Sequence, residues 1–358
     1  MNAGRSMSRG RLNIGVIGCG VIGKRHLASA STYERIRIAA VADLDEALAR
    51  EQAAEFGADA AYGSAEALIA DANVEAVVLA MPTGVRTPLA IQALEAGRHV
   101  LLEKPAAMNV GEVDRMIEAK GGRVAACASS RFRFSPYAEP VRKAIASGRL
   151  GAIREVRIVH HNPCGEPNPN PVAWRLRKAA NGGGYLVNWG VYDLDYLLGV
   201  TDWALEPETV LAQTWPIAGH LQHHVAEGSD AETHVSALIR CRSGATISMT
   251  RAEYAATSQE DGWQIIGERG AIRQPIGTGD PYAVYLDTAE ASSGTRTETL
   301  WEGEATWEPA HAGPVRDLAD AVLDGREPAT PLEKARVIQS ICDAVYASAE
   351  SGRCAPLP

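Results

Sequence analysis

The sequence contains no long apolar stretch. The chain has 358 residues, of which 46% are hydrophobic, but no apolar run approaches the length of about 18 residues that a membrane span requires. The opening segment MNAGRSMSRGR contains arginines and no apolar core, so it is not a secretory signal. We therefore expect a flexible tail at residues 1–11, no membrane partner and a cytoplasmic protein.

Basic residues are outnumbered by acidic ones. The sequence has 35 Lys and Arg against 44 Asp and Glu, which gives a formal net charge of -9. A protein that binds nucleic acid needs a basic face toward the phosphates, so this balance argues against a nucleic-acid partner. It is compatible with a small neutral substrate.

Paired cysteines are also missing. The six cysteines are scattered and none forms a C-x-x-C pair, so we expect reduced thiols. His220, His223 and His224 lie together in a polar stretch, but no convincing fourth ligand accompanies them. The sequence therefore predicts no metal site.

The first third of the chain alternates short apolar runs with helical patterns. This alternation is typical of right-handed β-α-β units around a parallel sheet. We expect strands at Leu12–Ile17, Arg37–Ala42, Val74–Ala80, His99–Glu103 and Val124–Ala128, and helices at Val21–Ser31, Glu46–Phe56, Ala65–Ala70, Pro88–Ala96 and Val110–Lys120. The pattern predicts an α/β Rossmann domain over residues 12–130.

The pattern changes after residue 130. Strands without intervening helices predict an α+β domain with a large, mostly antiparallel open sheet over residues 131–312. We expect these strands at Ile153–His161, Thr209–Pro216, Thr233–Cys241, Ala245–Ala252, Gly262–Gly267, Ala271–Gln274, Ala283–Asp287 and Glu298–Trp301, and helices at Tyr137–Ser147 and Gly183–Gly199. In residues 313–358 we expect two amphipathic helices, Gly313–Leu323 and Leu332–Ser351, that pack back on the Rossmann domain.

A glycine-rich loop follows the first strand. Its sequence, GCGVIG, runs from Gly18 to Gly23 and opens the first helix. Gly18 permits a tight turn, Gly20 lets the backbone approach a pyrophosphate, and Gly23 lets helix and strand pack closely. With Val21 and Ile22, the start of the helix offers N–H groups to the phosphates. The sequence therefore predicts a dinucleotide site, and a tight turn without a ligand is the alternative.

An acidic residue stands where such sites bind the adenosine ribose. Asp43 ends the second strand, twenty residues after Gly23, and Asp45 adds negative charge nearby. This carboxylate would repel a 2′-phosphate, and no arginine is its neighbour in the sequence. We therefore predict NAD as the cofactor in preference to NADP, and a turn-forming aspartate is the alternative.

Further motifs carry a family resemblance. They are Glu103-Lys104-Pro105 at the end of a strand, the segment from Arg131 to Pro136, and the run GGGYLVNWGVYDLD from Gly182 to Asp195. With the glycine loop, they make nearly the whole chain similar to the Gfo/Idh/MocA family, named after glucose–fructose oxidoreductase, inositol dehydrogenase and rhizopine catabolism. The resemblance implies a homodimer or homotetramer.

The resemblance also implies roles for residues around Lys104. Lys104 would reach the nicotinamide and the reacting hydroxyl, where its charge stabilises alkoxide character during hydride transfer. Four further residues would line the cofactor site: Met81, Pro82, Thr83 and Glu103. We expect a cis peptide between Lys104 and Pro105, as in relatives. A solvated loop lysine is the alternative.

The chain departs from the usual family pattern at two positions. Relatives carry Asp and His after the triple glycine, whereas this chain has Asn188 and Tyr192. Asn188 can bind a hydroxyl but cannot exchange a proton at neutral pH. The ordinary pKa of tyrosine is about 10, and the positive charges of Lys104 and the oxidised nicotinamide would lower it. We hypothesise that Tyr192 is the proton-transfer residue, as tyrosine is in some branches of the family.

Asp195 is the third polar residue of that run. Asn188, Tyr192 and Asp195 fall at i, i+4 and i+7 of the expected helix and would share one face. Asp195 would orient Tyr192 or a substrate hydroxyl, and a buried cap or ion pair is the alternative. If Tyr192 only packs or binds substrate, a water or Asp195 handles the proton.

Other residues are candidate substrate contacts. An indole beside hydrogen-bond donors is typical of a sugar site, and only one of the neighbours His160 and His161 can point inward from a strand. The candidates are Arg131, His160, Trp174 and Arg175. Relatives usually carry a histidine where Arg86 stands, so we expect Arg86 to contact either a polar substrate or a surface carboxylate.

These features together predict an oxidoreductase. It would transfer hydride between the nicotinamide and a secondary hydroxyl or ketone of a sugar, glycoside or cyclitol, with Lys104 and Tyr192 assisting proton transfer. One alternative is a sugar–sugar oxidoreductase with a tightly held cofactor, and another is an enzyme like dihydrodiol dehydrogenase. A non-catalytic NAD-binding regulator is the alternative of another class.

Overall fold

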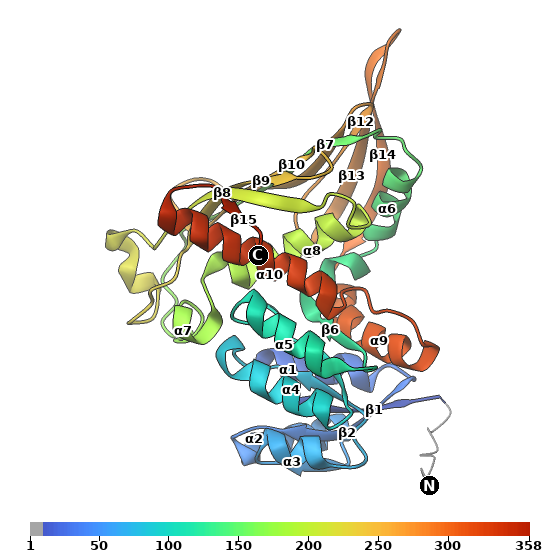
Figure 1. The fold of residues 1–358 in the computed structure, drawn as a ribbon, viewed down its shortest axis with the longest axis vertical. Coiled ribbons are helices and arrows are strands. Elements are labelled where there is room, and N and C mark those ends of the chain that lie inside the picture. The colour runs from blue at the N-terminus through green and yellow to red at the C-terminus, as the bar shows by residue number, and fades with distance from the viewer. Residues whose placement is uncertain (1–9) are drawn as a thin grey trace. The chain divides into compact units, whose positions relative to one another are not determined.

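The computed structural model describes residues 10–358, which form two compact units. The first contains residues 10–106, 111–128 and 311–335, and the second contains residues 107–110, 129–310 and 336–358. Of the tail expected at residues 1–11, residues 1–9 lie outside the described part. Figure 1 labels most of the helices and strands of both units.

The first unit is built on a parallel sheet, as the sequence predicts. In the described residues this sheet has six strands in the order β3-β2-β1-β4-β5-β6. The strands are β1 (Leu12–Ile17), β2 (Ile36–Ala42), β3 (Ala60–Tyr62), β4 (Ala76–Leu79), β5 (His99–Leu102) and β6 (Ala125–Cys127), and the helices are α1 (Val21–Ser31), α2 (Glu46–Phe56), α3 (Ala65–Ala70), α4 (Arg86–Glu95) and α5 (Val110–Lys120). The sequence did not predict β3, because three residues are too few to show a periodicity.

Local signals explain the ends of α2. Asp45 is its N-cap residue and accepts hydrogen bonds from the N–H groups of Ala47 and Leu48. Gly57 ends the helix with a φ of 70°, a left-handed conformation that glycine adopts without steric cost. The N-cap at Asp45 fixes where the chain passes from β2 into α2, and therefore where Asp43 lies.

The second unit is built on a mixed, mostly antiparallel sheet. In the described residues it has nine strands in the order β14-β13-β12-β11-β7-β10-β9-β8-β15, and β7 and β10 form its parallel pair. The strands are β7 (Ile153–Pro163), β8 (Pro207–Trp215), β9 (His234–Cys241), β10 (Thr246–Ala255), β11 (Glu260–Gly267), β12 (Gly270–Gln274), β13 (Gly279–Glu290), β14 (Gly294–Ala305) and β15 (Ala355–Pro356), and the helices include α6 (Ala138–Ala146), α7 (Lys178–Asn181) and α8 (Val191–Val200). One face of this sheet packs on α8 around a stacked pair, Tyr196 and Trp263, with ring centroids 4.4 Å apart.

The triple-glycine region differs from the single helix expected at Gly183–Gly199. It contains α7, a π-helical turn at Leu186–Gly190 and then α8. The buried Glu232 carboxylate accepts hydrogen bonds from the N–H groups of Gly184, at 2.9 Å, and Leu186, at 3.0 Å. These bonds engage amides at the start of the helical segment, and the π turn inserts an extra residue. The i, i+4 spacing expected between Asn188 and Tyr192 therefore does not describe a regular α-helical face.

The two C-terminal helices, α9 (Trp307–Asp324) and α10 (Leu332–Ser351), contribute to different units. Val315 and Leu318 of α9 lie in the core of the first unit. Ile338 and Ile341 of α10 instead join the core beneath the large sheet. The expectation that both helices pack on the Rossmann domain is therefore wrong for residues 336–358, because the apolar face of α10 is buried in the second unit.

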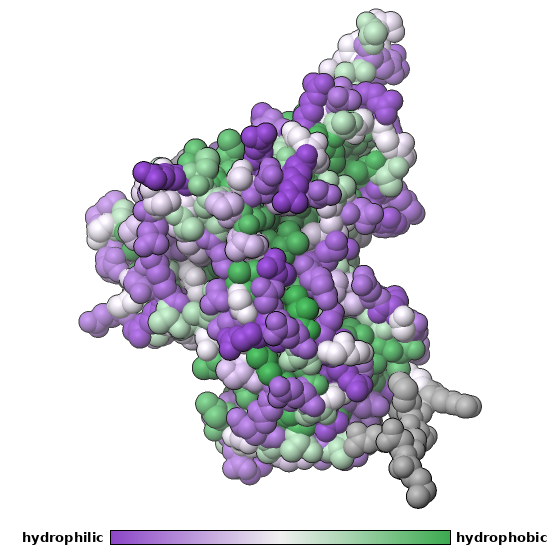
Figure 2. All heavy atoms as spheres, viewed as in Figure 1, coloured by the Kyte–Doolittle hydropathy of each residue, from purple (hydrophilic) through white to green (hydrophobic). Residues whose placement is uncertain are grey.

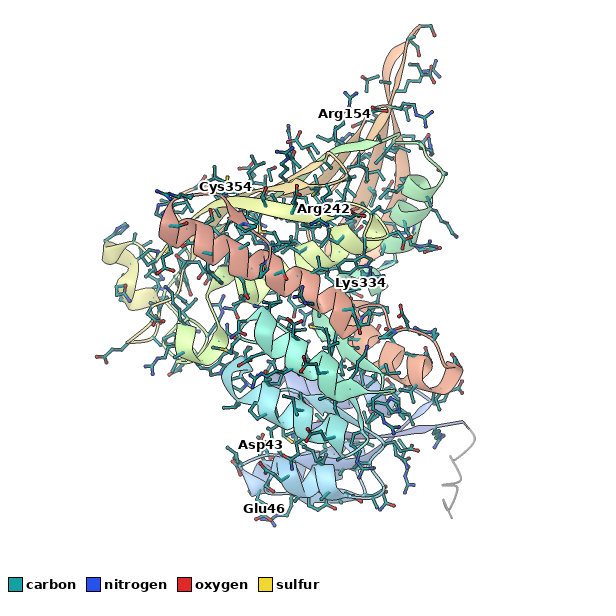
Figure 3. The ribbon with its side chains drawn as sticks, viewed as in Figure 1. Asp43, Glu46, Arg154, Arg242, Lys334 and Cys354 are labelled. Atoms are coloured by element: carbon teal, nitrogen blue, oxygen red, sulfur yellow. The ribbon has the colours of Figure 1, made fainter. Side chains whose placement is uncertain are left out.

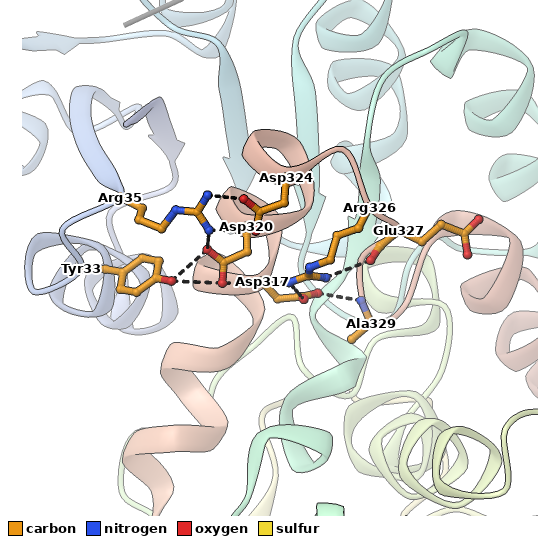
Figure 4. A network of polar contacts seen from close by, with 8 residues as sticks. All are labelled: Tyr33, Arg35, Asp317, Asp320, Asp324, Arg326, Glu327 and Ala329. Atoms are coloured by element: carbon orange, nitrogen blue, oxygen red, sulfur yellow. Dashed lines mark hydrogen bonds and ion pairs between the residues drawn. The ribbon is translucent and has the colours of Figure 1, made fainter. Parts of the chain in front are cut away.

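A polar network holds α9 in the first unit (Figure 4). Tyr33 donates to Asp320 at 2.8 Å, and the Arg35 guanidinium bonds both Asp320 and Asp324. Arg326 pairs with Asp317 at 2.8 Å. The contacts of Tyr33 and Arg35 join α9 to the segment between α1 and β2.

Polar and apolar side chains are interspersed on the molecular face shown in Figure 2. Among residues 10–358, no helix combines the length and the apolar character needed to cross a membrane.

Candidate functional site

The glycine loop has the geometry that its predicted roles require. Gly18 has a φ of 93°, and a Cβ there would lie 2.4 Å from the carbonyl oxygen of Ala80. A Cβ on Gly23 would lie 1.8 Å from the carbonyl oxygen of Gly18, so α1 packs against the loop at a distance that excludes side chains. A Cβ on Gly20 would meet no described atom within 4 Å. The backbone at Gly20 is thus open to a ligand.

Asp43 holds this loop from the end of β2. Its Oδ2 accepts a hydrogen bond from the N–H of Cys19 at 2.7 Å, and its Oδ1 accepts one from Asp45 at 2.9 Å. Figure 3 labels Asp43 and Glu46, the first residue of α2. Each carboxylate oxygen has a second lone pair, so Asp43 can also accept from ribose hydroxyls.

Apolar residues next to Asp43 and next to the glycine loop are exposed. Leu44, the next residue, is 93% exposed, and Val21 at the start of α1 is 81% exposed. Burial, followed by the charge of Asp43, raises the pKa of the Cys19 thiol to about 11, so this thiol is neutral at pH 7. A loop open at Gly20, free of side-chain caps on the described start of α1, and flanked by a carboxylate suits a dinucleotide.

The turn after β5 places Lys104. The Lys104–Pro105 peptide is cis, as expected. Glu103 Oε2 accepts the Lys104 N–H at 3.1 Å, and Glu103 Oε1 lies 2.9 Å from His26 Nε2. Glu103 and His26 are both buried. The Glu103 side chain thus fixes the backbone of Lys104 from one side and α1 from the other.

Arg86 has a role that the sequence did not indicate. It is 2% exposed, so the expected surface salt bridge is wrong. Its guanidinium donates to the carbonyl oxygens of Glu103 and Pro105, and to that of Met81 at 2.6 Å. It therefore joins the segment after β4 to the turn that contains Lys104.

The segment after β4 contains the other predicted cofactor contacts. Met81 and Pro82 precede a short 3-10 turn, Thr83–Val85, and Thr83 is buried. Because β1 and β4 are neighbours in the parallel sheet, the segment lies at the same edge as the glycine loop. Cofactor binding by these residues stays a prediction.

In the second unit, Tyr192 and Arg131 are in contact. The Arg131 guanidinium carbon lies 4.1 Å from the centroid of the Tyr192 ring, which is a cation–π geometry. The rings of Phe132 and Trp189 lie edge-on to Tyr192, at 5.7 and 5.9 Å. Arg131 and Tyr192 are both buried.

Asn188 and Asp195 have protein partners. The Asn188 amide donates to the carbonyl oxygen of Arg175 and accepts from Asn181, each at 3.2 Å. Asp195 accepts from the Ser129 hydroxyl at 2.5 Å. Both side chains are buried and organise the loops beside α8. Substrate contacts by either residue stay predictions.

The register of the sheet shows which of the two histidines on β7 points toward the core. His160 lies opposite Arg251, which is fully buried, so His160 is the one that points to the core side. Burial, followed by the charge of Arg251, lowers the pKa of His160 to about 4. His161 faces the other side, 3.4 Å from Glu260. His160 is therefore neutral at pH 7.

Trp174 and Arg175, in the loop before the triple glycine, differ in their surroundings. Trp174 is half-exposed, and Arg175 bonds Glu253 at 2.5 Å. Burial raises the pKa of Glu253, although the Arg175 and Arg251 charges oppose this shift. Arg175 therefore contacts β10, the strand that also contains Arg251.

A buried ion pair was not predicted from the sequence. Arg251 on β10 pairs with Asp193 on α8, and the Trp263 indole donates to Asp193 at 3.0 Å. Burial raises the pKa of Asp193, and Arg251 opposes the shift. One signal was available, because Arg251 continues the inward-facing alternation of Ile247 and Met249.

The histidine cluster offers no metal geometry. Within residues 10–358, no group of three or more His, Cys, Asp or Glu residues could hold a metal ion. His224 Nε2 lies 3.6 Å from Cys164 Sγ. All six cysteines, which fall within the described part, are free thiols.

Comparison with known proteins identifies the family. A profile described as "Oxidoreductase family, NAD-binding Rossmann fold" matches residues 12–126, and the profile of the Gfo/Idh/MocA C-terminal domain matches residues 139–273. An uncharacterized oxidoreductase of Rhizobium meliloti is 33% identical over 205 residues, 56% of this chain and 59% of that protein. The chain thus spans about three fifths of that relative's length.

Two other similarities cover more of the chain. A myo-inositol 2-dehydrogenase of Thermotoga maritima is 28% identical over 265 residues, 73% of this chain and 74% of that protein. The solved structure of a levoglucosan dehydrogenase in complex with NADH and levoglucosan matches with a TM-score of 0.85 at 23% identity, covering 97% of this chain and 100% of that one. The structural match shows the shared fold. Because the two profiles together match more than half of its residues, the chain belongs to the Gfo/Idh/MocA family of oxidoreductases.

Proposed function

We propose that this protein is an NAD-dependent dehydrogenase that oxidises a secondary hydroxyl of a sugar, glycoside or cyclitol, or reduces the corresponding ketone. The observation that carries the substrate class is a group of buried polar atoms. His160 Nδ1, Arg251 Nη1 and Glu253 Oε1 have no hydrogen-bond partner among the described residues. A buried polar atom without a partner destabilises a protein by about 1–3 kcal/mol.

These atoms belong to one face of the sheet. Arg251 and Glu253 are two residues apart on β10, and His160 is opposite Arg251 on β7. Together they offer a guanidinium donor, a carboxylate acceptor and a neutral imidazole. The hydroxyl groups of a polyol both donate and accept hydrogen bonds, and they would satisfy all three atoms. The names of two relatives, a myo-inositol 2-dehydrogenase and a levoglucosan dehydrogenase, support this class.

Asp43 supports NAD rather than NADP. Its carboxylate lies where the adenosine ribose binds in such loops, and would repel a 2′-phosphate. The next residue is the exposed, apolar Leu44, which offers no positive charge to that phosphate. The loop backbone at Gly20 and the start of α1 would hold the pyrophosphate.

Lys104 and Tyr192 are the proposed chemical groups. Bound NAD would supply the hydride acceptor at C4 of its nicotinamide. The Lys104 ammonium stabilises negative charge on the substrate oxygen. In its phenolate form, Tyr192 accepts the hydroxyl proton at its phenolic oxygen. The Arg131 guanidinium, which lies over the ring, holds the ring in place.

A second copy of the chain is the proposed partner of the outer face of the large sheet. Leu211 on β8 and Leu238 on β9 lie opposite each other in register, and both are about half exposed. Paired apolar side chains on an open sheet face are typical of protein interfaces. We expect the wild type to be a homodimer or homotetramer by light scattering, and the Leu238→Arg variant to be smaller. A monomeric wild type would contradict this assignment.

The test is turnover across a panel of sugars, inositols and glycosides, followed by NADH absorbance. We expect at least one polyol to be oxidised with NAD, and Glu253→Gln to raise the KM for it while the Kd of NADH is unchanged. NADH binding without turnover of any panel member would overturn the proposal and favour a non-catalytic NAD-binding regulator. Turnover between two sugars without release of NADH would instead indicate a sugar–sugar oxidoreductase.

A further inference from the structure

We propose that Arg86 is a positioning residue for Lys104, which holds the lysine backbone by binding the carbonyl groups on both sides of it. The inference rests on the proposed function of Lys104, because its kinetic consequence requires that Lys104 act in the reaction. Arg86 itself is buried and need not touch cofactor or substrate.

The geometry is specific to the Lys104 turn. One guanidinium nitrogen, Nη1, donates to the carbonyl oxygens of Glu103 and Pro105, which precede and follow Lys104 in the chain. The other, Nη2, donates to the carbonyl oxygen of Met81 at 2.6 Å. Arg86 thereby ties the lysine turn to the segment after the neighbouring strand, β4.

The Lys104 amide is held independently. Its N–H donates to Glu103 Oε2, and the same carboxylate contacts His26 on α1. The backbone of Lys104 is therefore fixed at its own N–H, at the carbonyl before it and at the carbonyl after it. Since the direction of a side chain follows from its backbone, these bonds set where the Lys104 stem begins.

An arginine suits this task because of its shape. Its planar guanidinium carries five N–H donors in a fixed fork, so it can bridge several carbonyl oxygens in a rigid arrangement. A lysine at position 86 would present three donors from one freely rotating centre. A methionine would fill the space but leave the carbonyls of Glu103, Pro105 and Met81 without this donor.

The expected consequence is a loss of turnover rather than of cofactor binding. The glycine loop and Asp43 follow β1 and β2, whereas Arg86 binds the segments that follow β4 and β5. A displacement of a catalytic group by about 1 Å can lower the rate about 100-fold. We therefore expect Arg86→Met to lower kcat by about 100-fold and to change the Kd of NADH by less than about twofold.

The chain offers a matched control in Arg98. This arginine is also buried in the first unit, and also donates to main-chain carbonyls, those of Ile69 at 3.2 Å and Asp71 at 3.0 Å. Arg98→Met should therefore lower the melting temperature as much as Arg86→Met does. Its kcat should stay near that of the wild type, whereas Arg86→Lys should recover part of the kcat that Arg86→Met loses.

A second measurement does not depend on turnover. The sequence has six lysines, so reductive methylation with 13C-formaldehyde gives few methyl resonances in an NMR spectrum. The resonance that is missing from the Lys104→Arg variant is that of Lys104. We expect Arg86→Met to shift the Lys104 resonance, and Arg98→Met to leave it in place. An unmoved Lys104 resonance in Arg86→Met, or equal kcat values for Arg86→Met and Arg98→Met, would overturn the proposal.

The two measurements separate this proposal from the proposed function. If the wild type binds NADH but oxidises no polyol, the proposed function fails. The Lys104 resonance still decides whether Arg86 positions Lys104.

Discussion

Replacing Asp43 with asparagine tests the cofactor assignment, because the two side chains have nearly the same shape and differ in charge. A hydrogen bond to a charged group contributes about 1.5–3 kcal/mol, and about 1.4 kcal/mol corresponds to a tenfold change in affinity. Loss of the ionic bond to the ribose should therefore raise the Kd of NAD by about 10- to 150-fold. The Kd of NADP should rise less, because the substitution also removes repulsion of its 2′-phosphate.

The same substitution has a cost in stability that the structure predicts. Asp43 accepts two N–H groups, from Cys19 and Asp45, one on each oxygen. Asparagine has one oxygen, so one of these bonds is lost, which should lower the free energy of unfolding by about 1–3 kcal/mol. Asp45→Ala is the matched control, since loss of the α2 cap costs about 1 kcal/mol without removing the ribose contact.

The assay is titration of each variant with NAD and NADP by calorimetry, combined with urea denaturation. We expect Asp45→Ala to keep the wild-type Kd for NAD at a similar loss of stability. An unchanged Kd for NAD in Asp43→Asn would refute the assignment of Asp43 to the ribose. An equal rise for both dinucleotides would refute its role in discriminating between them.

Three further predictions concern the second unit. Tyr192→Phe should lower kcat by about 10²- to 10⁴-fold with an unchanged Kd for NADH, and near-wild-type turnover at every pH would exclude Tyr192 as the proton-transfer residue. Asp193→Asn leaves the buried Arg251 charge without its counter-ion, which should lower the free energy of unfolding in urea by about 3–5 kcal/mol, whereas Asp287→Asn at an exposed pair should cost less than about 1 kcal/mol. The folded-state pKa of His160, about 4, lies below the ordinary value of 6.5, so the unfolded chain binds more protons between these values and stability should fall as the pH drops from 6.5 to 4. His160→Gln should flatten that part of the pH profile, and an equal slope in wild type and variant would contradict the cause.

The features that the sequence predicted are encoded by neighbouring residues. β1, the glycine loop and α1 follow one another in the chain, and Gly23 packs against Gly18 within that stretch. Gly57 signals the end of α2 in the same local way. Such patterns can be read from one sequence because each constraint acts over a few residues.

The features that the sequence did not reveal depend on distant residues. Arg251 meets Asp193 across 58 positions, and Glu232 reaches Gly184 across 48. Nothing near Leu186 in the chain signals the π turn. Arg86 looked like a surface or substrate residue because its partners are carbonyl groups, which every residue has.

The chain passes more than once between the two units, so the first unit cannot be separated from the second by a single cut. The first unit is assembled from three separate stretches, the last of which contains most of α9. A fragment that ended at residue 128 would expose the apolar surface that Val315 and Leu318 cover, and would leave Arg35 without Asp320. Such a fragment should aggregate rather than fold. Recombination that exchanges dinucleotide-binding units between relatives must therefore also transfer residues 311–335. A single crossover near residue 130 would yield a chimera in which α9 and the rest of the first unit come from different proteins.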